Sequence, residues 1–126
     1  MSTIQVLVAN EPRVFREAIA VALQEVRPGI ATVAIDPTDL ATSIDQFHPD
    51  LTICSELISA VETEVPAWVL LYPDCEDCAI TCVAGEQRKT NHLTLEDLVA
   101  LVDRTARARP SLQLGKLHRP PFPPPR

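Results

Sequence analysis

The sequence predicts an α/β fold with a mainly parallel sheet, and three observations support this. Five near-continuous apolar runs alternate with segments of helical periodicity, and such runs suit strands that are buried on both faces. The chain has 126 residues and is 46% hydrophobic, which suffices for one domain with its own core. Strands that alternate with helices imply right-handed crossovers and helices on both faces of the sheet. The expected strands are 6–9, 31–35, 51–54, 67–72 and 79–84.

The first two helices are predicted from periodicity and from their ends. Between the first two strands, apolar residues recur at spacings near 3.6, in a helix that begins near Pro12 and is stopped by Pro28-Gly29. These residues are Val14, Phe15, Ala18, Ile19, Ala22, Leu23 and Val26. Asp36-Pro37 is a good helix start, with Asp36 as the N-cap. The apolar face of this second helix contains Leu40, Ile44 and Phe47.

The later elements are less regular. A short third helix is expected over 56–63, capped by Ser55, and a final helix follows a capping box formed by Thr94 and Asp97. Residues 73–93 are too few for a helix, a strand and a loop, so a fourth helix between them is expected to be reduced or lost. A hairpin that turns at Gly85-Glu86, between 79–84 and 87–91, would use this space.

Charge and composition exclude several classes of protein. The net charge is −6 and the pI is near 4.9, which argues against a nucleic-acid partner, because binding phosphates needs clustered Lys and Arg. No apolar run approaches the roughly 20 residues that cross a bilayer, and no export signal is seen, so we expect no membrane association and a cytoplasmic location. In that compartment the four cysteines are expected to be reduced.

The C-terminal segment differs in composition from the rest of the chain. Residues 110–126 contain six of the twelve prolines and three positive charges but no acid. We therefore expect a folded domain over 1–109 and a disordered, proline-rich tail over 110–126. A polyproline II ligand for an aromatic-lined groove is the alternative interpretation of the tail.

Ligands of parallel α/β sheets bind beyond the carboxyl ends of the strands. Asn10 and Glu11 follow the first expected strand, Ser55 follows the third, and Leu71 and Tyr72 end the fourth. The sequence thus predicts that these five residues gather at one edge of the sheet.

Two of the strand ends carry a family resemblance. Residues 4–18, including the Arg16-Glu17 pair, and residues 49–55 resemble a response-regulator receiver domain, and the similarity covers roughly residues 4–72 and 94–106. The resemblance implies a flavodoxin-like three-layer sandwich with a five-stranded, mainly parallel sheet in the order 2-1-3-4-5. It also implies where phosphate chemistry would be found.

This chemistry is missing at nearly every matched position. The family's acid pair falls on Asn10 and Glu11, the phosphoacceptor aspartate on Ser55, and the signalling Thr or Ser on Leu71, followed by Tyr72. A single Glu is a poor magnesium site, and Ser has no carboxylate to accept a phosphoryl group. We therefore expect a degenerate receiver pocket, no cofactor and no catalytic residue.

The expected function is that of a phosphorylation-independent receiver-like module, which acts in signalling through a protein partner or as a homodimer. One alternative is a module that binds a small ligand or metal at the edge formed by Asn10, Glu11, Ser55 and Tyr72. Another is a thiol-redox or metal protein. Its candidate ligands are Cys75 and Cys78 in a C-x-x-C spacing, Cys82 and His92. Cys82 and Cys54 are more simply interpreted as small core residues.

Overall fold

The computed structural model describes residues 4–71, 78–91 and 93–118, with side chains described as far as residue 108. Tyr72, Cys75, His92 and the proline-rich end over 119–126 lie outside these ranges. The elements in chain order are β1 (Gln5–Ala9), α1 (Arg13–Val26), β2 (Ala31–Ala34), the 3-10 helix η1 (Pro37–Asp39), α2 (Leu40–Phe47), β3 (Leu51–Cys54), α3 (Ser59–Glu64), β4 (Ala67–Leu71), β5 (Cys78–Val83), β6 (Glu86–Asn91) and α4 (Leu95–His118).

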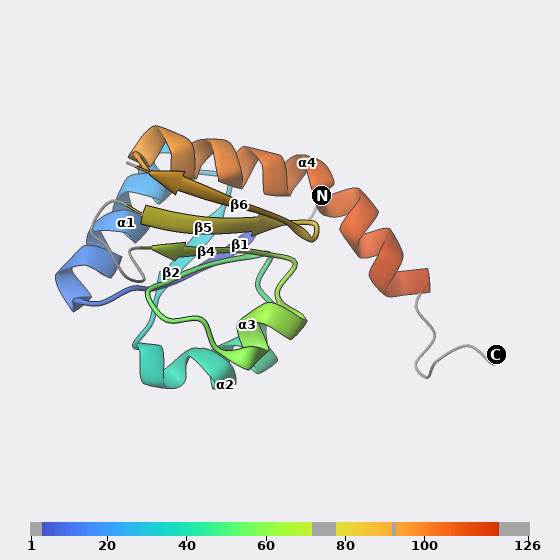
Figure 1. The fold of residues 1–126 in the computed structure, drawn as a ribbon, viewed down its shortest axis with the longest axis horizontal. Coiled ribbons are helices and arrows are strands. Elements are labelled where there is room, and N and C mark those ends of the chain that lie inside the picture. Colours follow the sequence, from blue (N-terminus) through green and yellow to red (C-terminus); the bar gives the residue numbers. More distant parts are fainter. Residues whose placement is uncertain (1–3, 72–77, 92, 119–126) are drawn as a thin grey trace.

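The strands form one mixed sheet in the order β2-β1-β3-β4-β5-β6. The first four strands are parallel, whereas β5 runs antiparallel to β4 and β6 antiparallel to β5. Helices α1 and α4 cover one face of the sheet, and α2 and α3 cover the other (Figure 1). The predicted α/β class is therefore confirmed.

The expected strand count is wrong, because the sheet has six strands and not five, although the first five follow the expected order 2-1-3-4-5. Only residues 72–77 connect β4 to β5. A parallel connection needs a crossover of about a dozen residues or more, so this segment allows only an antiparallel return. It is also too short for a substantial fourth helix, and none lies between β4 and α4 in the described part of the chain.

The expected hairpin is confirmed as the β5–β6 pair, with its turn one residue earlier than predicted. Ala84 and Gly85 form the two-residue loop, with φ angles of 54° and 85°. Positive φ at both positions is the requirement of a type I′ turn, whose twist matches that of the flanking strands. The sixth strand thus comes from a polar segment that carries no apolar alternation.

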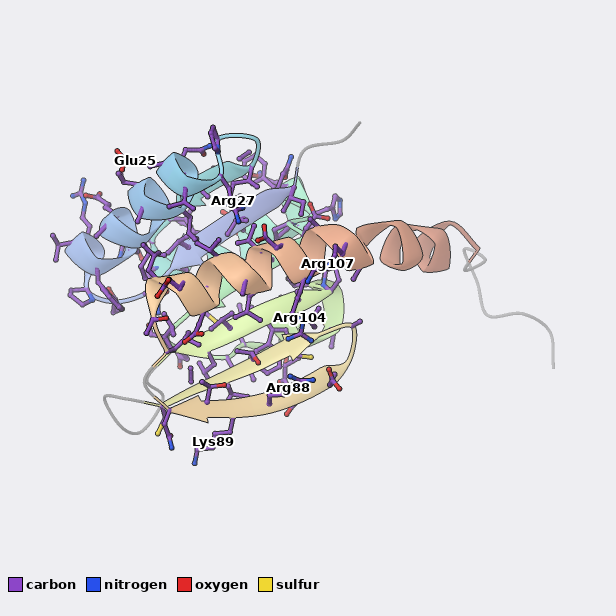
Figure 2. All side chains as sticks on the ribbon, turned by 90° about the horizontal axis from the view of Figure 1, so that it is seen from above. Glu25, Arg27, Arg88, Lys89, Arg104 and Arg107 are labelled. Atoms are coloured by element: carbon purple, nitrogen blue, oxygen red, sulfur yellow. The ribbon has the colours of Figure 1, made fainter. Side chains whose placement is uncertain are left out.

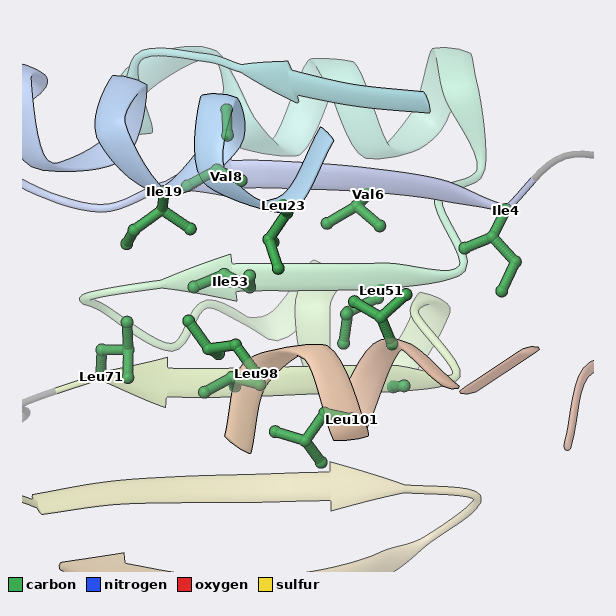
Figure 3. Close-up of a cluster of buried hydrophobic side chains, with 14 of the residues drawn as sticks. Ile4, Val6, Val8, Ile19, Leu23, Leu51, Ile53, Leu71, Leu98 and Leu101 are labelled. Atoms are coloured by element: carbon green, nitrogen blue, oxygen red, sulfur yellow. The ribbon is translucent and has the colours of Figure 1, made fainter. Parts of the chain in front are cut away.

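The core is divided by the sheet into two clusters. On the α1 and α4 face, aliphatic side chains from β1, β3 and β4 meet those of both helices (Figure 3). On the other face, α2 and α3 pack on the strand residues whose side chains point to the opposite side of the sheet, including Leu7, Trp68 and Cys82. All residues of β3 and β4 are buried, as predicted for strands that are covered on both faces.

Most helix ends agree with their sequence signals. Asp36 accepts a hydrogen bond from the Thr38 N–H at 2.9 Å, and the capping box is reciprocal: Thr94 N donates to Asp97 Oδ2 at 2.9 Å, and Asp97 N donates to Thr94 Oγ1 at 3.1 Å. Two expectations are wrong. Phe47 is about half exposed, and α3 begins at Ser59, so the third helix starts three residues later than predicted.

Helix α4 continues beyond the expected domain boundary. It runs through Pro110 to His118, so the backbone of residues 110–118 is helical, contrary to the expectation of a disordered tail that begins at residue 110. In Figure 1 this end of α4 extends past the edge of the sheet. The division of the chain at residue 109 stays a prediction.

Candidate functional site

The carboxyl ends of β1 and β3 lie together at one edge of the sheet, as predicted. The two strands are paired in parallel, with Ala9 opposite Cys54, so the residues that follow them meet beyond this edge. The backbone N–H of Glu11 donates a hydrogen bond to Ser55 Oγ at 3.1 Å. The structure thus brings Glu11 and Ser55 into direct contact.

Ser55 does not cap the third helix, contrary to expectation. The N-cap of α3 is Ile58, which has no side-chain capping bond. The Ser55 hydroxyl instead accepts the Glu11 N–H and so connects the loop after β3 to the loop after β1. Within the described part of the chain, the Ser55 hydroxyl therefore has a structural role, because it holds two loops together.

Leu71 ends β4, but its side chain faces the core. It is 2% exposed and packs in the cluster between the sheet and the α1 and α4 helices. Because side chains alternate along a strand, Leu71 points to the same face of the sheet as Ala67 and Val69. Leu71 therefore offers no hydrogen bond to a ligand at this edge.

Asn10 has an unusual environment for a polar residue. It is 1% exposed, and neither its side-chain Nδ2 nor its Oδ1 has a hydrogen-bond partner among the described residues. An unsatisfied buried amide costs about 1–3 kcal/mol. The Asn10 side chain is thus the polar group at this edge with the most unused hydrogen-bonding capacity.

Arg16 is a member of the site that the sequence analysis did not single out for this role. Its side chain is 9% exposed, and Nη1 lies 3.4 Å from the Asn10 carbonyl oxygen and 3.5 Å from Glu11 Oε2. Nη2 lies 3.8 Å from Asp36 Oδ2. One buried guanidinium therefore lies between the loop after β1 and the loop after β2.

The rotation of α1 about its axis decides which of its residues are buried, and this is the signal that could have identified Arg16. The buried residues of α1 are Arg16, Ile19, Ala20 and Leu23, whereas Val14 from the predicted apolar face is 73% exposed. The predicted face shares only Ile19 and Leu23 with the buried residues, so periodicity alone did not fix the rotation of the helix.

The electrostatics of the edge leave little reactive chemistry. The pKa of Asp36 is lowered, mainly by the Thr38 backbone N–H and hydroxyl and to a smaller degree by Arg16. The Glu11 and Asp36 carboxylates both face Arg16, so its charge is compensated. Within residues 4–71, 78–91 and 93–118, no group of three or more His, Cys, Asp and Glu side chains is arranged to hold a metal ion.

The cysteine cluster is only partly described. Cys54 and Cys82 are buried free thiols, as expected for core residues, and burial raises the pKa of Cys54 to about 12. Cys78 is disulfide-bonded, so the prediction that all four thiols are reduced is wrong. Cys75 and His92 lie outside the described residues.

The strand geometry also limits a metal site. Cys78 and Cys82 lie four residues apart on β5, which separates them by about 13 Å along an extended strand. Two thiolates bound to one zinc lie within about 5 Å of each other, because each Zn–S bond is about 2.3 Å. While β5 is formed, these two residues do not ligate the same ion.

An apolar groove of about 220 Å³ lies between α1 and the start of α4, and Leu71 at the end of β4 contributes to its lining. Phe15, Ala18, Ala22, Leu95 and Leu98 contribute to its lining.

No helix in the described ranges is both long and apolar enough to cross a membrane.

The chain matches no protein-family model, no curated protein and no solved structure. The receiver-domain resemblance therefore rests on the residues of this chain.

Proposed function

We propose that this protein is a phosphorylation-independent, receiver-like regulatory module that acts through protein–protein contacts. The observation that carries the proposal is the role of Ser55. At the position where the resemblance expects the phosphoacceptor carboxylate, this chain has a hydroxyl that accepts the Glu11 backbone N–H. A serine without an adjacent base is a weak nucleophile at neutral pH.

The sheet topology supports the receiver-like part of the proposal. The four parallel strands follow the order β2-β1-β3-β4, with α1 and the last helix on one face and α2 and α3 on the other, which is a doubly wound arrangement. The antiparallel β5–β6 hairpin departs from it. In the resembled family, output uses the region of the fourth helix, fifth strand and last helix, so this chain would present a different surface to its partners.

Phosphoryl transfer from acetyl phosphate tests the proposal. Purified protein is incubated with labelled acetyl phosphate and Mg²⁺, beside Ser55→Ala and a conventional receiver domain as the positive control. We expect no label on either form of this protein. Incorporation by the wild type that Ser55→Ala abolishes would overturn the proposal, and a phosphorylated histidine kinase as donor extends the same test.

A second candidate function is the binding of a small polar ligand at the same edge. It is favoured by the buried Asn10 amide, whose donor and acceptor atoms are both unused by the described residues. A ligand that binds only the native state raises the melting temperature. Thermal-shift screening of nucleotides and divalent metals should then give a shift that Asn10→Leu removes. The absence of any shift across the screen would reject this candidate.

A further inference from the structure

Charge is distributed very unevenly along this chain. Residues 28–87 contain eleven Asp and Glu but no Lys or Arg, whereas residues 88–126 contain eight Lys and Arg and only three Asp and Glu. The first segment includes α2 and α3, and the second includes α4 and all of β6 except Glu86 and Gln87. These elements lie on different sides of the molecule, so the sequence asymmetry becomes a spatial one.

The α2 and α3 side forms an acidic face. Its exposed carboxylates make no ion pair with any residue that the structure describes. We define this acidic face by Asp39, Asp45, Glu56, Glu62 and Glu64.

A basic face lies across the sheet, where α4 packs over the β5–β6 hairpin (Figure 2). Arg88 Nη2 and Arg104 Nη2 lie 3.2 and 3.3 Å from the same atom, Glu86 Oε1, so one carboxylate forms ion pairs with two guanidiniums. Arg107 follows Arg104 on α4 and lines a shallow groove with it. We define this basic face by Arg88, Arg104 and Arg107.

Among the described residues, the three guanidiniums of the basic face outnumber the carboxylates that lie close to them. Asp103, which pairs with Arg27, also interacts with Arg107. Glu86 is the one carboxylate paired with Arg88 and Arg104 among the described residues. The acidic face lies on the opposite side of the sheet, with the core between them, so the two faces of one chain do not meet (Figure 1). They are available to a second copy.

We infer that the protein self-associates head to tail, with the basic face of one copy docked on the acidic face of the next. A net charge of −6 makes copies repel in most orientations, and this orientation brings opposite charges together. Because the two surfaces differ, the contact is heterologous and each assembly keeps one free face at either end. The inference is independent of whether phosphotransfer is lost.

Sedimentation velocity over a series of concentrations and salts tests the inference. At low ionic strength the weight-average mass should rise with concentration to at least about twice the 13.8 kDa of the monomer. In about 1 M NaCl the Debye length is about 3 Å, and the mass should return to that of the monomer. A mass that stays monomeric at low salt would overturn the inference.

Two charge variants separate this contact from non-specific association. Arg104→Gln with Arg107→Glu cancels the positive charge of the basic face, because Glu86 can then pair with the remaining Arg88. Asp45→Lys with Glu64→Lys cancels most of the negative charge of the acidic face and puts each cation in the last turn of a helix, where the helix dipole favours it. Glu25→Lys, in the last turn of α1 and outside both faces, is the control. Circular dichroism verifies that each variant is folded.

Mixing the variants gives the decisive result. Each face variant alone should remain monomeric, and Glu25→Lys should associate like the wild type. An equimolar mixture of the two face variants retains one intact basic and one intact acidic face, so it should form dimers and nothing larger. Failure of the mixture to associate, or association of either variant alone, would overturn the head-to-tail contact.

Discussion

Ala84 has a backbone conformation that costs it stability. It is the first loop residue of the β5–β6 hairpin, with a φ of 54°, in the left-handed region that β-carbons disfavour by roughly 1–2 kcal/mol. Asn tolerates this region well, and Asn-Gly is the preferred type I′ pair. We expect Ala84→Asn to stabilise the protein by about 0.5–1 kcal/mol, measured by urea unfolding.

The matched control for this prediction is Gly85→Ala. A Cβ added at Gly85 would meet no atom within 4 Å, so the change causes no steric clash and tests the φ of 85° alone. It should destabilise by about 1 kcal/mol. Equal effects of both substitutions would contradict the type I′ assignment.

Cys54 should be chemically inert in the native protein. Its raised pKa, about 12, leaves almost no thiolate at neutral pH, and the thiolate is the reactive form. Native alkylation at about pH 8, followed by peptide mass spectrometry, should leave Cys54 unmodified, whereas alkylation in denaturant should label it. Rapid native labelling would contradict the buried position at the end of β3.

The residues of the candidate site were only partly predictable. Strand ends follow from the apolar runs, so the meeting of Glu11 and Ser55 at one edge could be expected. The bond between them could not, because loop conformation decides whether Ser55 caps a helix or accepts the Glu11 N–H. The burial of Arg16 depends on the rotation of α1 about its axis, which the apolar periodicity did not fix.

At the scale of elements, one ion pair joins α1 to α4. Arg27 donates twice to the Asp103 carboxylate, at 2.9 and 2.8 Å, and this contact lowers the pKa of Asp103. Both side chains are about a third exposed or more, so a double-mutant cycle with Arg27→Ala and Asp103→Ala should give a small stabilising coupling, as is usual for exposed ion pairs.

The coupling between Arg27 and Asp103 should depend on pH. Because the folded pKa of Asp103 lies below the unfolded one, the stabilisation is complete above the unfolded pKa and is lost as the pH falls through the folded pKa. The cycle repeated at about pH 2 should give a coupling near zero. A coupling unchanged between about pH 7 and pH 2 would show that the pair does not form.

The start of α4 depends on its capping box. Thr94→Ala removes the acceptor of the Asp97 N–H and should cost about 1 kcal/mol, as seen from the urea midpoint. Thr63→Ala, which removes an exposed hydroxyl bonded to Ser59 O within α3, is the control and should cost less. Equal losses would contradict a specific role for the cap.

At the scale of the whole molecule, the sequence predicts the α/β class, the parallel strands and the β5–β6 hairpin, but β6 could be placed only through its turn. Residues 86–91 are all polar, so they lack the apolar alternation that marks a strand, and only the turn before them indicates pairing. Helix α4 was expected to end before Pro110, because proline disfavours a helix interior, yet it continues to His118.

The central claim is that the edge formed by Asn10, Glu11 and Ser55 is a structural junction within a receiver-like scaffold. Backbone amide NMR spectra, recorded while Mg²⁺ and acetyl phosphate are added, test this most directly. We predict that the Glu11 and Ser55 amide signals stay in place, since Ser55 Oγ is already occupied by the Glu11 N–H. A saturable shift centred on these two amides, with a phosphoryl group on the protein, would contradict the account.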